Sequence, residues 1–195
     1  MVDVRVVPSD PAPTVQDAIS EEMRKVIHKG DARRAYLLID ASRSPEIRFV
    51  LEALSDDALC LFDGSAFTDL AEVAPWLVPL SPVNDGVLSW FLQDGFGKDR
   101  GLFLLAGEEP RRVKTALKRS LRVEDEDGAH LYFKYYRPSV FRTYIPQMTP
   151  EQASYILRDI AQVWLEDPDH SARLQRYAIR EGTLRRVDLD LRTTG

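Results

Sequence analysis

Two aspartates stand at the ends of short apolar runs that are typical of strands. Asp40 ends the run 35–40, and Asp63 follows the run 58–62. In an open α/β sheet, ligands bind beyond the carboxyl ends of the strands, where two carboxylates can hold a magnesium ion. The alternative is that both residues only form turns and helix caps. No third acidic residue with supporting spacing accompanies them, so we favour turns and caps and keep a magnesium-dependent hydrolase using Asp40 and Asp63 as the alternative.

The other residue types used in catalysis lack the spacing of known sites. Three histidines fall in three different predicted elements, without metal-ligand spacing: His28, His130 and His170. No serine lies in a Gly-x-Ser-x-Gly elbow, and the glycines before Lys98 do not have phosphate-loop spacing. Cys60, the only cysteine, lies within the apolar run 58–62 and is expected to be a small buried hydrophobe. We therefore expect no catalytic residue, no metal and no cofactor.

A basic segment stands out in a chain whose net charge is −5. The pattern predicts a helix that starts at Pro110, with Val113, Ala116 and Leu117 on its apolar side. Its exposed cations are expected to be Arg111, Arg112, Lys118 and Arg119. They could attract an acidic partner, or they could simply form the solvated face of a helix. We predict that they make a charged contact with a partner.

An aromatic segment follows at 132–138. Alternation in a strand would put Phe133 and Tyr135 on one face, with Tyr132, Lys134 and Tyr136 on the other. Aromatic and arginine side chains are enriched in protein interfaces, although a strand within the fold explains them equally well. We predict a partner surface at or beside four residues: Tyr136, Arg137, Phe141 and Arg142.

The order of the predicted elements indicates the fold class. The first part reads helix, strand, helix, strand, with strands at 35–40 and 58–62 and a helix between them. This order favours parallel strands joined by a helical crossover. The run 74–80 contains two prolines and is expected to be an edge strand or an extended segment, and 102–106 a further buried strand. We therefore predict a mixed α/β fold whose central sheet is mostly parallel and is flanked by helices.

The remaining segments predict hairpins and a well-capped helix. The acidic loop 124–128 separates the two strands of one hairpin, and Glu181-Gly182 forms the turn of another. Thr149, Pro150 and Gln152 begin a helix whose apolar stripe continues to Trp164. We expect a flexible N-terminus at 1–13, an α/β lobe at 14–146 and a small C-terminal lobe of helix and hairpin at 147–195.

Composition indicates a globular protein. The chain has 195 residues, of which 44% are hydrophobic and 29% charged. The N-terminal residues do not form a secretory signal, and no apolar run approaches the roughly 20 residues that cross a bilayer. We expect a cytoplasmic protein, monomeric when free. Its mild acidity disfavours binding to nucleic acids or anionic membranes.

The order of several short motifs resembles a known family. These motifs are Tyr36-Leu37-Leu38-Ile39-Asp40-Ala41, Ala74-Pro75-Trp76-Leu77-Val78-Pro79-Leu80, the basic helix, and Leu131-Tyr132-Phe133-Lys134-Tyr135-Tyr136-Arg137-Pro138. Together they resemble the effector-adaptor (chaperone) family of bacterial type VI secretion systems, known as Tap or Tec proteins. Arg137-Pro138-Ser139 stands where that family has Asp-Pro-Arg, and the basic helix lacks the family's histidine.

The resemblance implies a non-catalytic protein with two protein partners. Such adaptors bind a toxic effector in the cytoplasm and load it onto the spike (VgrG-type) protein of the secretion machine. An immunity-type or regulatory binding module of the same fold class is a further alternative.

Overall fold

The computed structural model describes residues 14, 17, 21, 33–80, 86–124, 127–171 and 173–190. The flexible segment predicted at 1–13 lies outside the described residues, as does most of the helix predicted after it. The start of that helix is described. The Thr14 N–H donates to Asp17 at 2.8 Å and the Asp17 N–H donates to the Thr14 hydroxyl at 3.2 Å, so the predicted cap is confirmed.

Seven strands form one sheet in which every neighbouring pair is antiparallel. In chain order they are β1 (Arg33–Asp40), β2 (Leu59–Cys60), β3 (Pro75–Pro79), β4 (Gly101–Gly107), β7 (Ile160–Glu166), β8 (Arg173–Arg180) and β9 (Thr183–Asp190). Their order across the sheet is β2-β3-β1-β4-β7-β8-β9. The predicted mixed α/β class holds, but the prediction of a mostly parallel sheet is wrong.

The error comes from the position of β3. Strands β1 and β2 do run in the same direction, because each is antiparallel to β3, but β3 lies between them and they never pair. The edge-strand alternative for 74–80 is therefore also wrong, although the segment is extended. Its two prolines are tolerated because their missing N–H groups face away from β1. The Pro75 carbonyl accepts from the Leu61 N–H, just beyond β2, and the Leu80 N–H donates to Ala35 of β1, so the preceding Pro79 faces the opposite side, beyond the two-residue strand β2.

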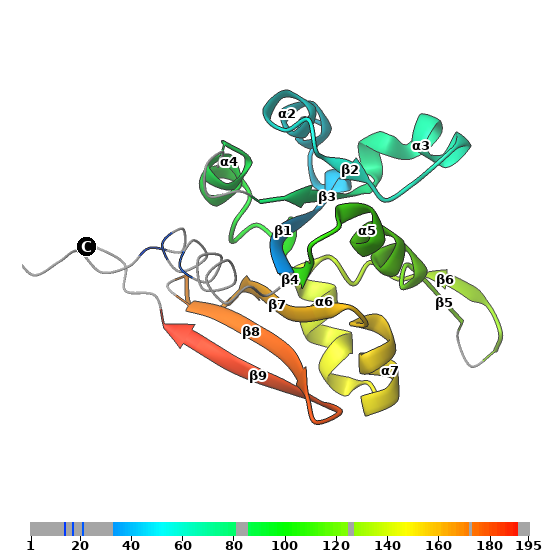
Figure 1. The fold of residues 1–195 in the computed structure, drawn as a ribbon, viewed down its shortest axis with the longest axis vertical. Helices are drawn as coiled ribbons and strands as arrows, with labels where there is room; N and C mark the ends of the chain where they lie inside the picture. The colour runs from blue at the N-terminus through cyan, green and yellow to red at the C-terminus, as the bar shows by residue number, and fades with distance from the viewer. Residues whose placement is uncertain are drawn as a thin grey trace, which may run out of the picture.

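Helices cover both faces of the sheet (Figure 1). On one face lie α2 (Ile47–Leu54) and α4 (Gly86–Asp94), which pack on Leu37 and Ile39 of β1. On the other lie α5 (Pro110–Arg119), α6 (Pro138–Tyr144) and α7 (Pro150–Ile156), which pack on Tyr36 and Leu38. The alternation of side chains along β1 thus supplies both halves of the core. No helix in the described part of the chain is long and apolar enough to cross a membrane.

Short elements connect these layers. They are the helix α3 (Ser65–Leu70) and the 3-10 turns η1 (Ala41–Arg43), η2 (Ala71–Val73) and η3 (Ile145–Gln147). Strands β5 (Arg122–Glu124) and β6 (His130–Tyr132) form a separate antiparallel hairpin, as predicted, which projects from the body of the molecule (Figure 1).

The C-terminal part agrees with the sequence in its turns and caps. Thr149 and Gln152 form the predicted capping box, and β8 and β9 form the predicted hairpin around Glu181 and Gly182. The helix does not continue to Trp164, however, since it ends at Ile156 and residues 160–166 form β7. Pairing with β4 and β8 on its two sides overrides the helical spacing of these apolar residues. Strands β7–β9 extend the sheet that contains β1, and the domain limits at residues 13 and 146 stay predictions.

Candidate functional site

Helix α5 presents the basic surface predicted from the sequence. Its N-cap is Glu109, whose carboxylate accepts hydrogen bonds from the backbone N–H groups of Arg111 and Arg112 at 3.0 and 2.8 Å. Its buried residues are Val113, Ala116 and Leu117. The four cations predicted to contact a partner are consequently exposed: Arg111, Arg112, Lys118 and Arg119.

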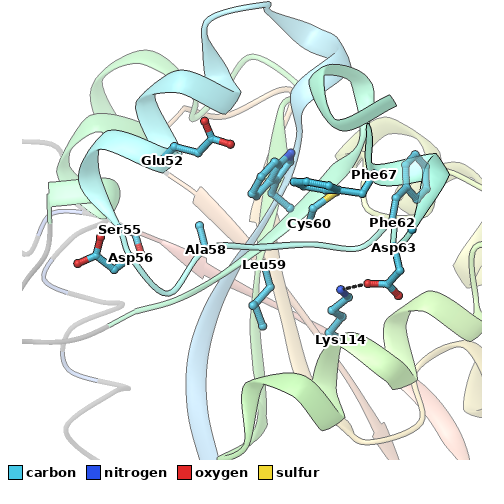
Figure 2. A pocket seen from close by; sticks show the side chains of 12 residues that line it. Glu52, Ser55, Asp56, Ala58, Leu59, Cys60, Phe62, Asp63, Phe67 and Lys114 are labelled. Carbon is cyan, nitrogen blue, oxygen red and sulfur yellow. Dashed lines mark hydrogen bonds and ion pairs between the residues drawn. The ribbon is translucent and has the colours of Figure 1, made fainter. Parts of the chain in front are cut away.

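One carboxylate lies against this helix. Asp63 accepts hydrogen bonds from the ammonium groups of Lys114 and Lys118, the latter at 2.6 Å. The hydrogen bonds from Lys114 and Lys118 hold the pKa of Asp63 below its usual value. Figure 2 shows Asp63 turned toward Lys114, beside a hollow that contains Cys60. One aspartate shared between two lysines leaves this part of α5 with excess positive charge.

A hollow of about 610 Å³ lies between helices α3 and α5 and the strands of the β5–β6 hairpin, and we call it the α3–α5 hollow. Its apolar wall consists of Phe62, Ala66, Leu70, Leu121 and Tyr132. Its polar residues are Asp63, Thr115, Lys118, Arg119 and Arg122. Leu70 and Tyr132 are 46% and 42% exposed, so the apolar wall is open to solvent.

A second groove, of about 950 Å³, lies on the other side of the hairpin, against α6 and α7. Its apolar lining includes Leu131, Phe133, Tyr144 and Tyr155, and three of these four side chains are exposed. Its lining contains two cations, Arg122 and Lys134, and two carboxylates, Glu124 and Glu151, so the numbers of positive and negative charges are equal. The α3–α5 hollow differs because cations outnumber carboxylates around it.

The third hollow, of about 520 Å³, contains the single cysteine (Figure 2). Cys60 is buried, as predicted, and packs with the core on the α2–α4 face of the sheet. Burial raises the pKa of its thiol, and a raised pKa lowers the fraction of thiolate, which is the nucleophilic form. This hollow therefore presents a structural cysteine.

Asp40, the other aspartate of the magnesium hypothesis, is fully buried at the end of β1. It accepts hydrogen bonds from the backbone N–H and the hydroxyl of Ser42 at 3.0 and 2.6 Å, and from the Arg137 guanidinium at 2.7 Å. Asp63 is already held by two lysines, so neither aspartate offers a free carboxylate. In the described ranges, no group of three or more His, Cys, Asp or Glu residues could hold a metal ion.

The four residues predicted beside a partner surface fall into two pairs. Tyr136 and Phe141 are fully buried in the core beneath α5 and α6. Arg137 and Arg142 are partly exposed and bind within the fold, Arg137 to Asp40 and Arg142 to the backbone carbonyl of Glu166 at 2.9 Å. A contact of this segment with a partner stays a prediction. Of the four residues, only the exposed parts of the two arginines could take part in such a contact.

The predicted two-faced strand at 132–136 is wrong, because β6 ends at Tyr132. The next residues leave the hairpin and turn into the core, where Tyr135 and Tyr136 are both buried. The hydroxyl of Tyr135 donates to the carbonyl of Leu117 at 2.9 Å, which fixes this turn against α5. Tyr132 therefore remains as the exposed aromatic of the segment.

Sequence reasoning missed Leu70 as a surface residue. It ends the short helix α3, for which the sequence analysis made no prediction. The available signal was the sequence around Leu70: the segment is short, Leu70 follows the polar pair Thr68 and Asp69, and the apolar residues do not repeat with the spacing that marks a buried stripe.

A protein-family model matches more than half of the chain. The model described as domain of unknown function (DUF4123) matches residues 35–155, which include most of β1, the α3–α5 hollow, the β5–β6 hairpin and α6. Comparisons with curated proteins and with solved structures found no significant match.

Proposed function

Because the chain belongs to the DUF4123 family, we propose that it is a non-catalytic adaptor that binds a toxic effector protein and loads it onto the spike protein of a type VI secretion system. The family match supports this proposal together with the motif order that resembles Tap and Tec adaptors. In this role the protein works in the cytoplasm, is a monomer when free and binds two proteins in turn.

The observation that carries the proposal is the surface formed by α5 and its neighbours. Helix α5 exposes four cations, and two of them, Lys118 and Arg119, line a hollow whose apolar wall reaches solvent. Charged groups of one sign speed the encounter with a partner of the opposite sign, while exposed apolar side chains supply most of the binding energy. Such a surface suits a protein that binds and later releases another protein.

The two aspartates support a binding role over hydrolysis. Both serve to hold other parts of the chain, Asp40 the start of α6 and Asp63 the basic helix. A magnesium-dependent hydrolase would need these carboxylates free to bind a cation.

The test is co-purification with the products of neighbouring genes. The tagged chain is expected to retain both a toxin and a spike protein encoded beside it. If neither protein is retained, the proposal is contradicted. Charge reversal of Arg111, Arg112, Lys118 and Arg119 is expected to weaken retention of one partner at least tenfold, with a change in melting temperature of less than about 3 °C. The matched control is Arg185→Glu, which reverses an exposed arginine on β9.

A further inference from the structure

The α3–α5 hollow combines an apolar wall with cations for which the described part of the chain supplies only one carboxylate at the hollow. Arg119 and Arg122 are exposed and form no ion pair with any described residue. Lys118 shares Asp63 with Lys114. The hollow therefore has three cations and one carboxylate, and that carboxylate is already bound.

The apolar wall of the hollow is also exposed to solvent. Leu70 and Tyr132 both line the hollow and remain almost half exposed, while Phe62 packs edge-on against Tyr132 with ring centroids 5.9 Å apart. A volume of about 610 Å³ falls within the roughly 300–1,000 Å³ of pockets that enclose a ligand, and it can accept a bulky apolar side chain.

We propose that the α3–α5 hollow binds an acidic amphipathic segment of a partner protein. A Leu or Phe side chain of that segment enters between Leu70 and Tyr132, and acidic residues beside it pair with Arg119 and Arg122. The identification of this partner as the effector rests on the proposed function. The acidic and apolar character of the segment is inferred from the hollow alone.

Charge and shape favour this occupant over others. A nucleic acid would meet only three cations at the hollow, on a chain whose net charge is −5. A free phosphate would pair with the arginines but leave the apolar wall exposed. An acidic segment with an apolar anchor satisfies both parts of the hollow, since it buries Leu70 and Tyr132 and neutralises Arg119 and Arg122.

The first test uses a synthetic peptide and the full chain. A helical peptide with leucines four residues apart and glutamates between them is added to ¹⁵N-labelled protein, and backbone amide signals are followed by NMR. Shifts are expected at Leu70, Arg119, Arg122 and Tyr132, and they should weaken at 0.5 M salt because surface charge pairs are screened. Absence of shifts at these residues with millimolar peptide would overturn the proposal.

Control peptides separate the two parts of the recognition. Replacing the leucines by serines removes the anchor, and replacing the glutamates by lysines reverses the charge. Each peptide is expected to bind at least tenfold more weakly than the parent peptide. Equal binding of all three would show non-specific association and would also overturn the proposal.

Variants of the protein test the same two parts. Arg119→Glu with Arg122→Glu, and separately Leu70→Ser, are expected to weaken peptide binding at least tenfold, whereas Leu70→Met and Arg185→Glu should change it less than twofold. The exposure of these residues predicts unchanged melting temperatures. Unchanged binding in the double arginine variant would contradict the proposed charge pairing.

Failure of this inference is distinguishable from failure of the proposed function. If the chain retains its effector but the Leu70 and arginine variants retain it equally well, the adaptor role stands and the hollow is not the contact. If no toxin or spike protein is retained, the adaptor role fails, while the peptide experiment still decides whether the hollow binds acidic segments.

Discussion

Asp40 and Arg137 lie 97 residues apart in sequence and form an ion pair of 2.7 Å between Oδ2 and Nη2. Asp40 is fully buried at the end of β1, and Arg137 is the N-cap residue of α6. Lys134 adds a 3.3 Å hydrogen bond to the hydroxyl of Ser42, which itself binds Asp40. The pair therefore fixes the segment after the β5–β6 hairpin to the end of β1, an inner strand of the sheet.

Removal of Arg137 is expected to destabilise the fold. Arg137→Ala leaves the buried Asp40 without its cation and should lower the free energy of unfolding by about 3 kcal/mol, measured by urea denaturation. Arg137→Lys should recover part of this loss. Arg158→Ala is the control and should cost less than about 1 kcal/mol, because it removes a partly exposed arginine that contacts Tyr155, by stacking and by a hydrogen bond to its carbonyl. Loss of partner binding in Arg137→Ala without loss of stability would instead place Arg137 at a partner surface.

Two adjacent tyrosines are expected to respond oppositely to loss of their hydroxyl groups. Tyr135→Phe removes the donor to the Leu117 carbonyl and should cost about 1–2 kcal/mol, because that buried carbonyl loses its partner. The buried Tyr136 hydroxyl makes no hydrogen bond of normal geometry with any residue that the structure describes, so Tyr136→Phe should be neutral or stabilising by up to about 1 kcal/mol. Thermal or urea unfolding of both variants checks this, and a larger loss in Tyr136→Phe would show that its hydroxyl has a partner.

Asp63→Asn is expected to strengthen binding to an acidic partner. The change frees Lys114 and Lys118 from their shared carboxylate and raises the positive charge beside the α3–α5 hollow. Affinity for the acidic peptide should rise severalfold at low salt and return toward the wild-type value at 0.5 M salt. A magnesium-dependent hydrolase using Asp63 predicts loss of activity in the same variant, so this substitution separates the two functions.

The contribution of Asp63 to stability should depend on pH. Hydrogen bonds from Lys114 and Lys118 place its pKa below the usual 3.8 in the folded state, so the folded chain binds the proton less readily than the unfolded chain. Its stabilising effect is therefore full above the unfolded pKa and is lost as pH falls through the folded pKa. Because the Asp63 side chain is more than half exposed, the free energy of unfolding of Asp63→Asn should be only about 0.5 kcal/mol lower than that of the wild-type protein. Urea unfolding of the wild-type protein and of Asp63→Asn at pH 7, 5, 4 and 3 measures this difference. It should be constant above about pH 5 and shrink below pH 4. A difference in unfolding free energy that grows in acid would contradict the pairing of Asp63 with the two lysines.

A substitution in the turn between β8 and β9 is expected to raise the stability of the protein. Glu181 and Gly182 have φ values of 52° and 74°, as in a two-residue turn in which both positions are left-handed. Asparagine tolerates this conformation better than glutamate, so Glu181→Asn should stabilise the protein by about 0.5 kcal/mol, whereas Gly182→Ala should cost about 1 kcal/mol. Thermal unfolding measures both changes, and stabilisation by Gly182→Ala would contradict the assigned turn.

The sequence predicted the features that depend on neighbouring residues. The amphipathic pattern of α5, the capping box of Thr149 and the turn at Glu181 and Gly182 were all readable, because their hydrogen bonds join residues within a few positions of each other. The exposure of Arg111 and Arg119 followed from the same helical spacing.

The sheet topology and the candidate site depended on contacts between residues distant in sequence. A buried apolar run suits a parallel or an antiparallel neighbour equally well, so the position of β3 between β1 and β2 could not be read from the pattern. The sequence also placed Tyr136 on a surface, whereas the end of β6 at Tyr132 turns it into the core. Only the tertiary structure brings Leu70, Arg119 and Tyr132 around one hollow, because the packing of α3, α5 and the hairpin beside one another, and not their order in the chain, decides which side chains meet.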